Sequence, residues 1–236
     1  MKDLALRYLL KNEIKHIGMI ECIRYDEIEY LYCAEDGVFL YDKDAELYML
    51  ATDGEEVCKK ALEACPKLYL LVCHNQYEYD VASVKYGLFG LNKCHQVVWT
   101  SKKKLPTTGV CEVRRLEPTD ENIDFVFEHY TLAFAREHIA DMMQSLGIYG
   151  AYYQGKLVGF IGRHEERSLG LLEVLPEYRR MGIATELESH LVNELIDNGE
   201  VPYGHIIYGN DNSVIMHKNL GYTFSDTPVF WIFPKK

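Results

Sequence analysis

The chain has 236 residues, of which 48% are hydrophobic, and its formal net charge at pH 7 is −11. Duplex nucleic acid is bound by a basic face, so this acidic balance argues against a nucleic-acid partner. No apolar run approaches the roughly 18 residues that cross a bilayer, which argues against a membrane partner. The odd number of cysteines, 7, and the lack of a recognisable signal segment lead us to expect a cytoplasmic protein.

The first half of the chain alternates predicted strands and helices. Residues 37–41 and 45–51 are predicted strands around the turn Asp42-Lys43-Asp44, and Asp53-Gly54 opens a helix over residues 55–64. A strand over 67–73, a helix near 81–87 and a strand at 97–99 follow. Residues 101–109 are the longest polar, turn-rich interval, so we expect two domains, 1–104 and 110–236.

All the cysteines lie before residue 112. The dipeptides Cys73-His74 and Cys94-His95 could supply zinc ligands. However, the chain has no Cys-x-x-Cys pair, and each cysteine sits in an apolar strand or helix pattern, as buried free cysteines do. We therefore expect core cysteines and no metal. The seven are Cys22, Cys33, Cys58, Cys65, Cys73, Cys94 and Cys111.

The second half has its own order of predicted elements. A strand over 110–116 precedes a helix that starts at Asp120 and runs toward residue 135, and a second helix covers 137–145. A hairpin follows, with strands 147–153 and 157–163 around the turn at Gly155. A strand then ends at Pro176, and a long helix begins after Gly182. The remaining elements are a strand over 203–208, a short helix, and strands over 222–225 and 229–233.

The turn between Pro176 and the long helix suits an anion. The first turn of a helix leaves backbone N–H groups without intrahelical partners and carries the positive end of the helix dipole. Gly182 lets phosphate oxygens approach the backbone, and Arg179 and Arg180 add charged donors. An arginine-rich turn of this kind can also be simply solvated, so the pattern alone leaves both interpretations open.

Two segments in the second half resemble a known family. Arg179-x-x-Gly182-x-Ala184 is similar to the acetyl-CoA pyrophosphate loop of the GCN5-related N-acetyltransferases (GNAT). The run from Asn210 to Gly221-Tyr222 resembles the family's second signature, an Asn after a strand, a short helix and a closing Gly-aromatic pair. The resemblance covers about residues 110–233.

The resemblance implies a fold class. It is an α+β fold in αβα layers, with a mixed, mostly antiparallel sheet and flanking helices, the acyl-CoA N-acyltransferase fold. The smaller N-terminal α/β domain echoes the same element order, which suggests a degenerate copy of the fold. Asp53-Gly54 lacks the arginines of the later loop, so this copy is not expected to hold a pyrophosphate in the same way. An unrelated small mixed domain remains the alternative.

The resemblance also implies a ligand and a set of residues. Acetyl-CoA would be the acyl donor, a backbone N–H near Val174 would polarise the acyl carbonyl, and Asn210 would contact the pantetheine arm. His217 stands where the family often has a Tyr that protonates the leaving thiolate, and a packing role is its alternative. Glu173 is the first candidate for general base, before Glu165 and Glu166. The predicted cofactor-binding residues are Val174, Arg179, Arg180, Met181, Gly182, Ile183, Ala184, Asn210 and Ser213.

By this resemblance we expect an acyl-CoA-dependent N-acyltransferase that transfers acetyl to a primary amine of a small molecule or amino acid by direct attack on the thioester. Asn212-Ser213 and the run 219–222 resemble the glycine N-acyltransferase-like, FR47-like branch. A non-catalytic acyl-CoA-binding regulatory module is the alternative function. The sequence does not define the acceptor, and it leaves a homodimer open.

Overall fold

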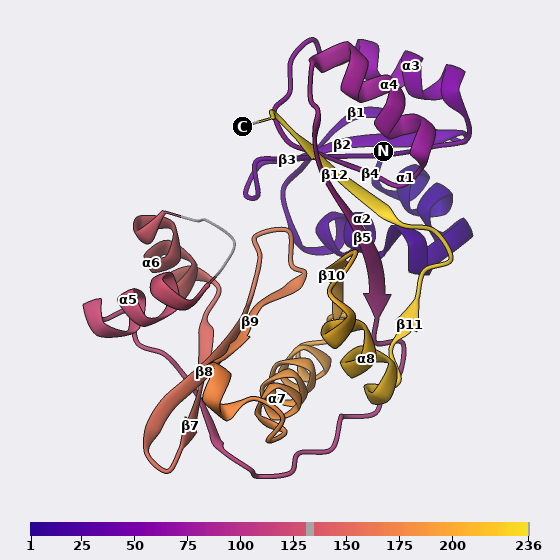
Figure 1. Ribbon diagram of the computed structural model, residues 1–236. Coiled ribbons are helices and arrows are strands. Elements are labelled where there is room, and N and C mark those ends of the chain that lie inside the picture. The colour runs from indigo at the N-terminus through magenta and orange to yellow at the C-terminus, as the bar shows by residue number, and fades with distance from the viewer. Residues whose placement is uncertain (131–134, 236) are drawn as a thin grey trace. The chain divides into compact units, whose positions relative to one another are not determined.

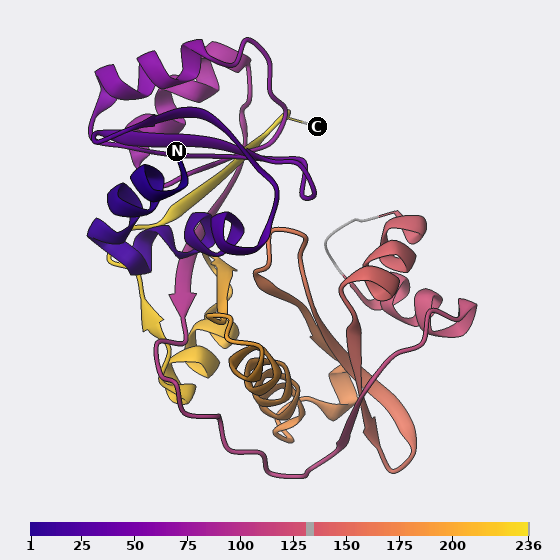
Figure 2. The ribbon, with the colours of Figure 1, turned by 180° about the vertical axis from the view of Figure 1, so that it is seen from behind.

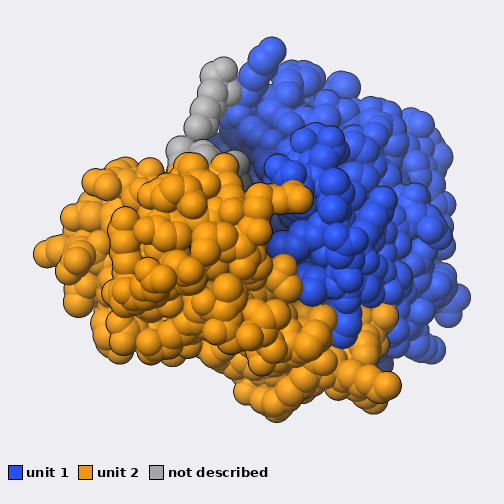
Figure 3. Space-filling model, turned by 60° about the horizontal axis from the view of Figure 1, so that its bottom comes forward, with its two compact units in different colours: residues 1–99, 203–236 blue, residues 100–202 orange. Residues whose placement is uncertain are grey.

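The computed structural model describes residues 1–130 and 135–235. The chain forms two compact units, which Figure 3 shows in different colours. Unit 1 contains residues 1–99 and 203–236, and unit 2 contains residues 100–202. The first boundary falls close to the polar interval at 101–109. The grouping of residues 203–236 with unit 1 differs from the expected division into 1–104 and 110–236, and strand pairing explains the difference.

Unit 1 is built on a mixed sheet (Figure 1). The order of hydrogen-bonded strands is β1-β2-β3-β4-β12-β5-β10, with β11 also on β5. The β3–β4 pair is parallel and the other pairs are antiparallel. The strands are β1 (Ile28–Ala34), β2 (Gly37–Asp42), β3 (Leu47–Thr52), β4 (Leu71–Cys73), β5 (Gly90–Val98), β10 (Tyr203–Ile207), β11 (Thr223–Phe224) and β12 (Val229–Phe233).

Helices cover both faces of this sheet (Figures 1 and 2). Helices α1 (Lys2–Leu9) and α2 (Glu13–Tyr25) pack on the face that contains Val38 and Leu40. Helices α3 (Glu55–Glu63) and α4 (Gln76–Tyr86) pack on the other face, with Phe39 and Leu50. Because successive strand residues point to opposite faces, strands that are apolar throughout require cover on both sides. The αβα layering predicted for the fold is confirmed.

Unit 2 contains an antiparallel sheet in the order β9-β8-β7-β6. Its strands are β6 (Glu112–Arg115), β7 (Ile148–Tyr153), β8 (Lys156–Arg163) and β9 (Leu169–Val174). Helices α5 (Asp120–His129) and α6 (Arg136–Ser145) share a core with Ile148, Phe160 and Leu171. Helix α7 (Ile183–Asp197) packs against β7, β8 and β9. The α+β class with a mostly antiparallel sheet is therefore confirmed.

The two halves of the chain repeat one order of elements. From α1 to β5 the order is two helices, three strands, helix, strand, helix (α4) and strand. The order from α5 to β12 is the same, with α8 (Asp211–Leu220) in the place of α4 and the two-residue β11 added. This correspondence agrees with the expectation that the first half is a degenerate copy.

The last strands of the two repeats are exchanged. β12 pairs with β4 of the first repeat, whereas β5 pairs with β10 of the second. β12 and β5 also pair with each other, antiparallel, from Val229 opposite Cys94 to Phe233 opposite Gly90. The end of the chain is therefore hydrogen-bonded into the first repeat, which is why residues 203–236 belong to unit 1.

The polar interval before the second repeat is anchored along α7. Leu105 donates its backbone N–H to Asn193 Oδ1 at 2.7 Å and accepts from Asn193 Nδ2 at 2.9 Å. Thr108 and Gly109 donate their backbone N–H groups to the Glu186 carboxylate. Residues 105–109 are thus fixed by side chains of unit 2.

Several predicted elements differ from the observed ones. Helices α1 and α2 and strand β1 were not predicted, α4 begins earlier than expected, and β4 is shorter. Helix α5 ends at His129, and residues 131–134 of the predicted helix lie outside the described residues. Five cysteines are buried, as predicted for core cysteines, whereas Cys33 and Cys111 are only partly buried, which differs from the prediction. The buried ones are Cys22, Cys58, Cys65, Cys73 and Cys94. Within the described residues, no helix is long and apolar enough to cross a bilayer.

Candidate functional site

The turn between β9 and α7 has the backbone of an anion-binding loop. A short 3-10 turn, Pro176–Tyr178, leads to Gly182, which precedes α7 with a φ of +87°. A Cβ at Gly182 would meet no atom within 4 Å, so the space above the backbone is open. The first helical bond runs from Glu186 N to Gly182 O at 3.0 Å, and no side chain caps the helix. The first-turn N–H groups are thus available to a phosphate.

The arginines of this loop have different roles. Arg179 donates from Nε to the carbonyl of Val174 at 2.9 Å, and its Nη2 lies 3.7 Å from Glu173. It therefore holds the end of β9 against the loop. Arg180 is exposed and has a positive φ of +64°. Both side chains remain accessible, as the predicted pyrophosphate loop requires.

Strand β9 contains an irregularity that the sequence did not reveal. Phe160 pairs with Glu173 and Gly162 with Gly170, so one residue of β8 faces two residues of β9. Leu171, one of those two, has a φ of +49°, which is uncommon for a leucine. A bulge of this kind redirects the strand and leaves backbone groups outside the ladder. The bulge lies just before Glu173 and Val174, where the family resemblance placed the reacting carbonyl.

Two carboxylates and a phenol gather beside β9. Glu173 is half-buried; burial raises its pKa, while Arg179 and His129 act in the opposite direction. Burial also raises the pKa of Glu166, which accepts a hydrogen bond from Ser168. Tyr130 is influenced by both carboxylates, and burial raises the pKa of its phenol. Raised carboxylate pKa values suit proton acceptance near neutral pH.

The structure therefore brings Glu173 together with the predicted loop in unit 2. Glu165, an alternative base, is engaged 3.1 Å from His138. Tyr130 and His129 were missed from the sequence because they lie at the end of α5, distant from every motif. The only sequence signal for this cluster was the presence of polar side chains next to an apolar strand.

The remaining predicted residues lie on α8 in unit 1. Asn210 caps this helix by accepting from Ser213 N at 3.2 Å. His217 is 6% exposed, with Nδ1 2.8 Å from the Ser213 carbonyl and its ring edge-on to Tyr222, with centroids 4.7 Å apart. Asn210 thus caps the start of α8, and His217 packs between the Ser213 carbonyl and Tyr222.

The Cys-His dipeptides do not assemble a metal centre among the described residues. The cluster there that could hold a cation is Cys22, Asp26 and Asp42, with donor atoms within 4.8 Å of one another. Asp42 is buried, and its Oδ1 accepts from the backbone N–H groups of residues 44 and 45, which explains its place in the β2–β3 turn. The expectation that the protein uses no metal stays a prediction.

Comparisons with known proteins agree with this architecture. Residues 145–231 match the family model described as FR47-like protein. A search of curated proteins found no match. Among solved structures, a Drosophila protein has a TM-score of 0.68 at 15% identity, over 100% of this chain and 88% of that chain.

Two further solved structures carry descriptive names. A GCN5-related N-acetyltransferase from Kribbella flavida has a TM-score of 0.57 at 14% identity, over 94% of this chain and 96% of that chain. A tandem GNAT protein from the clavulanic acid biosynthesis pathway has a TM-score of 0.50 at 13% identity, over 92% of this chain and 86% of that chain. Residues 145–231 thus form an FR47-like segment in a chain that has the fold of the GCN5-related N-acetyltransferases.

Proposed function

We propose that the protein is an acyl-CoA-dependent N-acyltransferase that acetylates a primary amine of a small molecule or amino acid. The observation that carries this proposal is the turn at Gly182, with its positive φ, open space and uncapped helix α7, inside an FR47-like segment. The positive φ requires a glycine, and the open space beside it leaves the first-turn N–H groups of α7 within reach of a phosphate.

The residues around this turn fit the pyrophosphate of coenzyme A. The N–H groups of Ile183 and Ala184 and the guanidinium groups of Arg179 and Arg180 would hold the two phosphates. Glu186 also lies in the first turn of α7, but its carboxylate accepts hydrogen bonds from Thr108 and Gly109. That carboxylate is engaged away from the loop, so the charge balance at the turn favours an anion.

The thioester of the bound donor supplies an activated acyl group. For the reaction the amine must be neutral, so Glu173, with its raised pKa, takes the amine proton. The N–C bond forms, the C–S bond breaks, and a backbone N–H near Val174 stabilises the oxyanion between these steps. The departing thiolate then takes a proton, for which His217 is the candidate.

One observation favours a second function, a non-catalytic acyl-CoA-binding module. His217 replaces the tyrosine that the family often uses, and it is buried against Tyr222. A histidine in this setting can serve packing alone, in which case the chain would bind acyl-CoA without transferring the acyl group.

The two functions are separated by one pair of measurements. Thermal melting with and without acetyl-CoA tests donor binding, which both functions require. Release of free thiol from acetyl-CoA, measured with a panel of amino acids, polyamines and aminoglycosides, tests transfer. Stabilisation together with amine-dependent thiol release supports the enzyme. Stabilisation without thiol release supports the binding module. If neither stabilisation nor thiol release is seen, the proposed binding of acetyl-CoA at the loop is refuted.

A further inference from the structure

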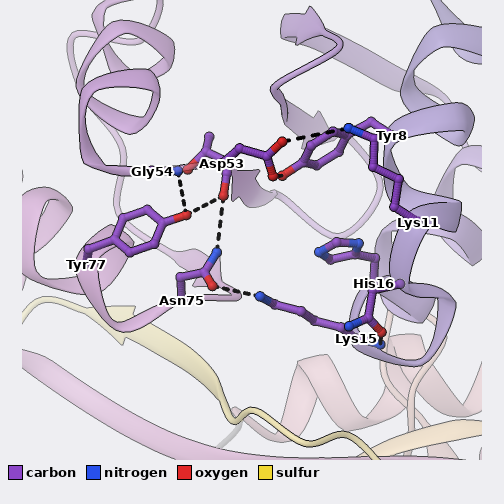
Figure 4. Close-up of a pocket in the computed structure, with 10 residues that line it drawn as sticks. Tyr8, Lys11, Lys15, His16, Asp53, Gly54, Asn75 and Tyr77 are labelled. Atoms are coloured by element: carbon purple, nitrogen blue, oxygen red, sulfur yellow. Dashed lines mark hydrogen bonds and ion pairs between the residues drawn. The ribbon is translucent and has the colours of Figure 1, made fainter.

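Unit 1 contains a pocket at the carboxyl ends of β3 and β4 (Figure 4). Its volume is about 380 Å³, near the lower end for small-molecule sites. Its walls come from the region of α1 and α2, from the turn Asp53-Gly54 that opens α3, and from Asn75 at the start of α4. In the repeated topology, Asp53-Gly54 corresponds to the loop before α7, and Asn75 corresponds to Asn210.

Polar contacts close a ring around this pocket. Tyr8 donates its hydroxyl to Asp53 at 2.9 Å, and Lys15 donates to Asn75 Oδ1 at 2.7 Å. Asn75 donates in turn to the Thr52 carbonyl at 3.4 Å. The ring of His16 stacks on the ring of Tyr8, with centroids 5.9 Å apart. The pocket is thus held in shape without a ligand.

Buried Glu78 makes one wall rigid. It is 0% exposed, and its carboxylate accepts from Thr52 N, Thr52 Oγ1, His74 N and Asn75 N at 2.7 to 2.9 Å. These donors satisfy Glu78 locally. It therefore fixes the ends of β3 and β4 and does not serve as the counter-ion of a ligand.

Lys15 lacks an ionic partner in this arrangement. Its Nζ is half-buried and bonds to a neutral amide, and within residues 1–130 and 135–235 no carboxylate lies within 4.0 Å of it. Burial lowers its pKa, while the more distant Glu78 and Asp53 act in the opposite direction. A half-buried ammonium facing a pocket is stabilised by an anionic group brought by a ligand.

His16 offers the complementary group. It is 6% exposed, and its Nδ1 lies 3.0 Å from the Leu9 carbonyl, so this nitrogen carries the hydrogen. Burial lowers the pKa of His16 to about 4, and the ring is therefore neutral at pH 7 with Nε2 as an acceptor. In the described part of the chain Nε2 has no hydrogen-bond partner, and Figure 4 shows the ring among the pocket side chains. Nε2 can therefore accept a hydrogen bond from a ligand.

The start of α3 adds to the attraction for an anion. Gly54 has a φ of +124°, and a Cβ there would meet nothing within 4 Å. No side chain caps the helix, whose first bond runs from Cys58 N to Gly54 O. The carboxylates of Glu55 and Glu56 in this turn pair with Lys59.

We propose that this pocket binds a small carboxylate with a hydrogen-bond donor on the neighbouring carbon, as in a 2-hydroxy acid or a 2-amino acid. The carboxylate is held by Lys15 and the start of α3, and the hydroxyl or ammonium group donates to Nε2 of His16. The site lies wholly within unit 1, and the proposal is independent of acyl transfer at the second repeat.

Calorimetric titration of the full chain at pH 7 tests the proposal. The probes are glycolate, L-lactate, glycine and L-alanine, with acetate and propionate as carboxylates that lack the donor. We expect at least one donor-bearing probe to bind ten-fold or more tightly than acetate and propionate. Binding of glycolate and L-lactate alone identifies a hydroxy acid as the ligand. Binding of glycine and L-alanine alone identifies an amino acid. Equal binding of acetate, or no binding of any probe, overturns the proposal.

Two variants test the assigned groups. Lys15→Met should weaken binding of the preferred probe at least ten-fold. Lys67 is exposed and lies outside the pocket, so Lys67→Met should not change binding. His16→Asn keeps a donor near the Leu9 carbonyl and removes the Nε2 acceptor, so it should abolish the preference over acetate. Unchanged preference in folded His16→Asn would overturn the role of His16. Melting temperatures without ligand report folding of each variant.

Discussion

The turn after β3 and the turn after β9 occupy corresponding places in the two repeats, yet their side chains differ in kind. The second carries two exposed arginines and a glycine that precedes an uncapped helix. The first carries Asp53, which accepts a hydrogen bond from Tyr8 of α1, and Gly54, which donates its backbone N–H to the hydroxyl of Tyr77 in α4. Each turn leads into the N-terminus of a helix, which favours an anion. The side chains around each turn then decide which anion can bind there.

The largest expected effect comes from removing the glycine of the second turn. In Gly182→Val a β-branched residue must adopt a φ of +87°, and its side chain enters the open space. We expect acetyl-CoA affinity to fall at least 100-fold, measured by calorimetry. Gly87→Val at the end of α4, where φ is +66°, is the control for backbone strain and should retain acetyl-CoA binding. Equal acetyl-CoA affinity in the two variants would mean that Gly182 does not lie at the acetyl-CoA site.

A smaller effect should follow from the proposed base. Glu173→Gln removes the proton acceptor while preserving shape, so we expect turnover to fall about 100-fold with little change in the KM for acetyl-CoA. Because burial raises the pKa of Glu173 above the ordinary value of 4.5, activity should rise with pH through that raised value, and this limb should vanish in the variant. Glu177→Gln, at an exposed position, is the matched control. Normal turnover of Glu173→Gln would place the base elsewhere.

The first repeat should respond to acid through His16. Its pKa falls from 6.5 to about 4 on folding, so the unfolded chain binds the proton more tightly. The stability that this group contributes is complete above pH 6.5 and is lost as the pH falls toward 4, by at most about 3 kcal/mol. Denaturant unfolding of His16→Asn between pH 7 and 4 should show a shallower loss than the unsubstituted chain. Parallel losses would mean that folding does not lower the pKa of His16.

The smallest effect is expected for His217. If it protonates the thiolate, His217→Gln should lower turnover about ten-fold at saturating substrate, with little change in melting temperature. If His217 only packs against Tyr222, the melting temperature of His217→Gln should fall and its turnover should not change. Tyr222→Phe keeps the ring contact and serves as the control for packing.

The fold was largely predictable where local patterns are strong. The hairpin of β7 and β8, helix α7 with its apolar stripe, and the short helix after Asn210 all appear where the sequence placed them. Helix α2 was not predicted because it is buried on several faces, where it contacts α1 and β5, and so lacks the one-sided apolar stripe of a surface helix. Residues His16 to Ile23 of this helix are all buried.

The candidate site was predictable only in part. The loop from Arg179 to Ala184 is contiguous, so its chemistry could be read along the chain. The neighbours of Glu173 come from α5 and from the β8–β9 loop, and their meeting depends on packing. In the same way, the pocket of unit 1 joins Lys15 to Asn75, which lie 60 positions apart.

By itself the sequence determined the order of elements in the second half and the residues of the anion-binding turn, because helix starts, turns and apolar periodicity depend on neighbours a few positions away. Only the tertiary structure decided that β5 and β12 change places between the repeats, because strand pairing is chosen by backbone hydrogen bonds between distant segments. The tertiary structure likewise decided that the pKa of His16 is lowered and that of Glu173 is raised, because burial disfavours the charged form of each group.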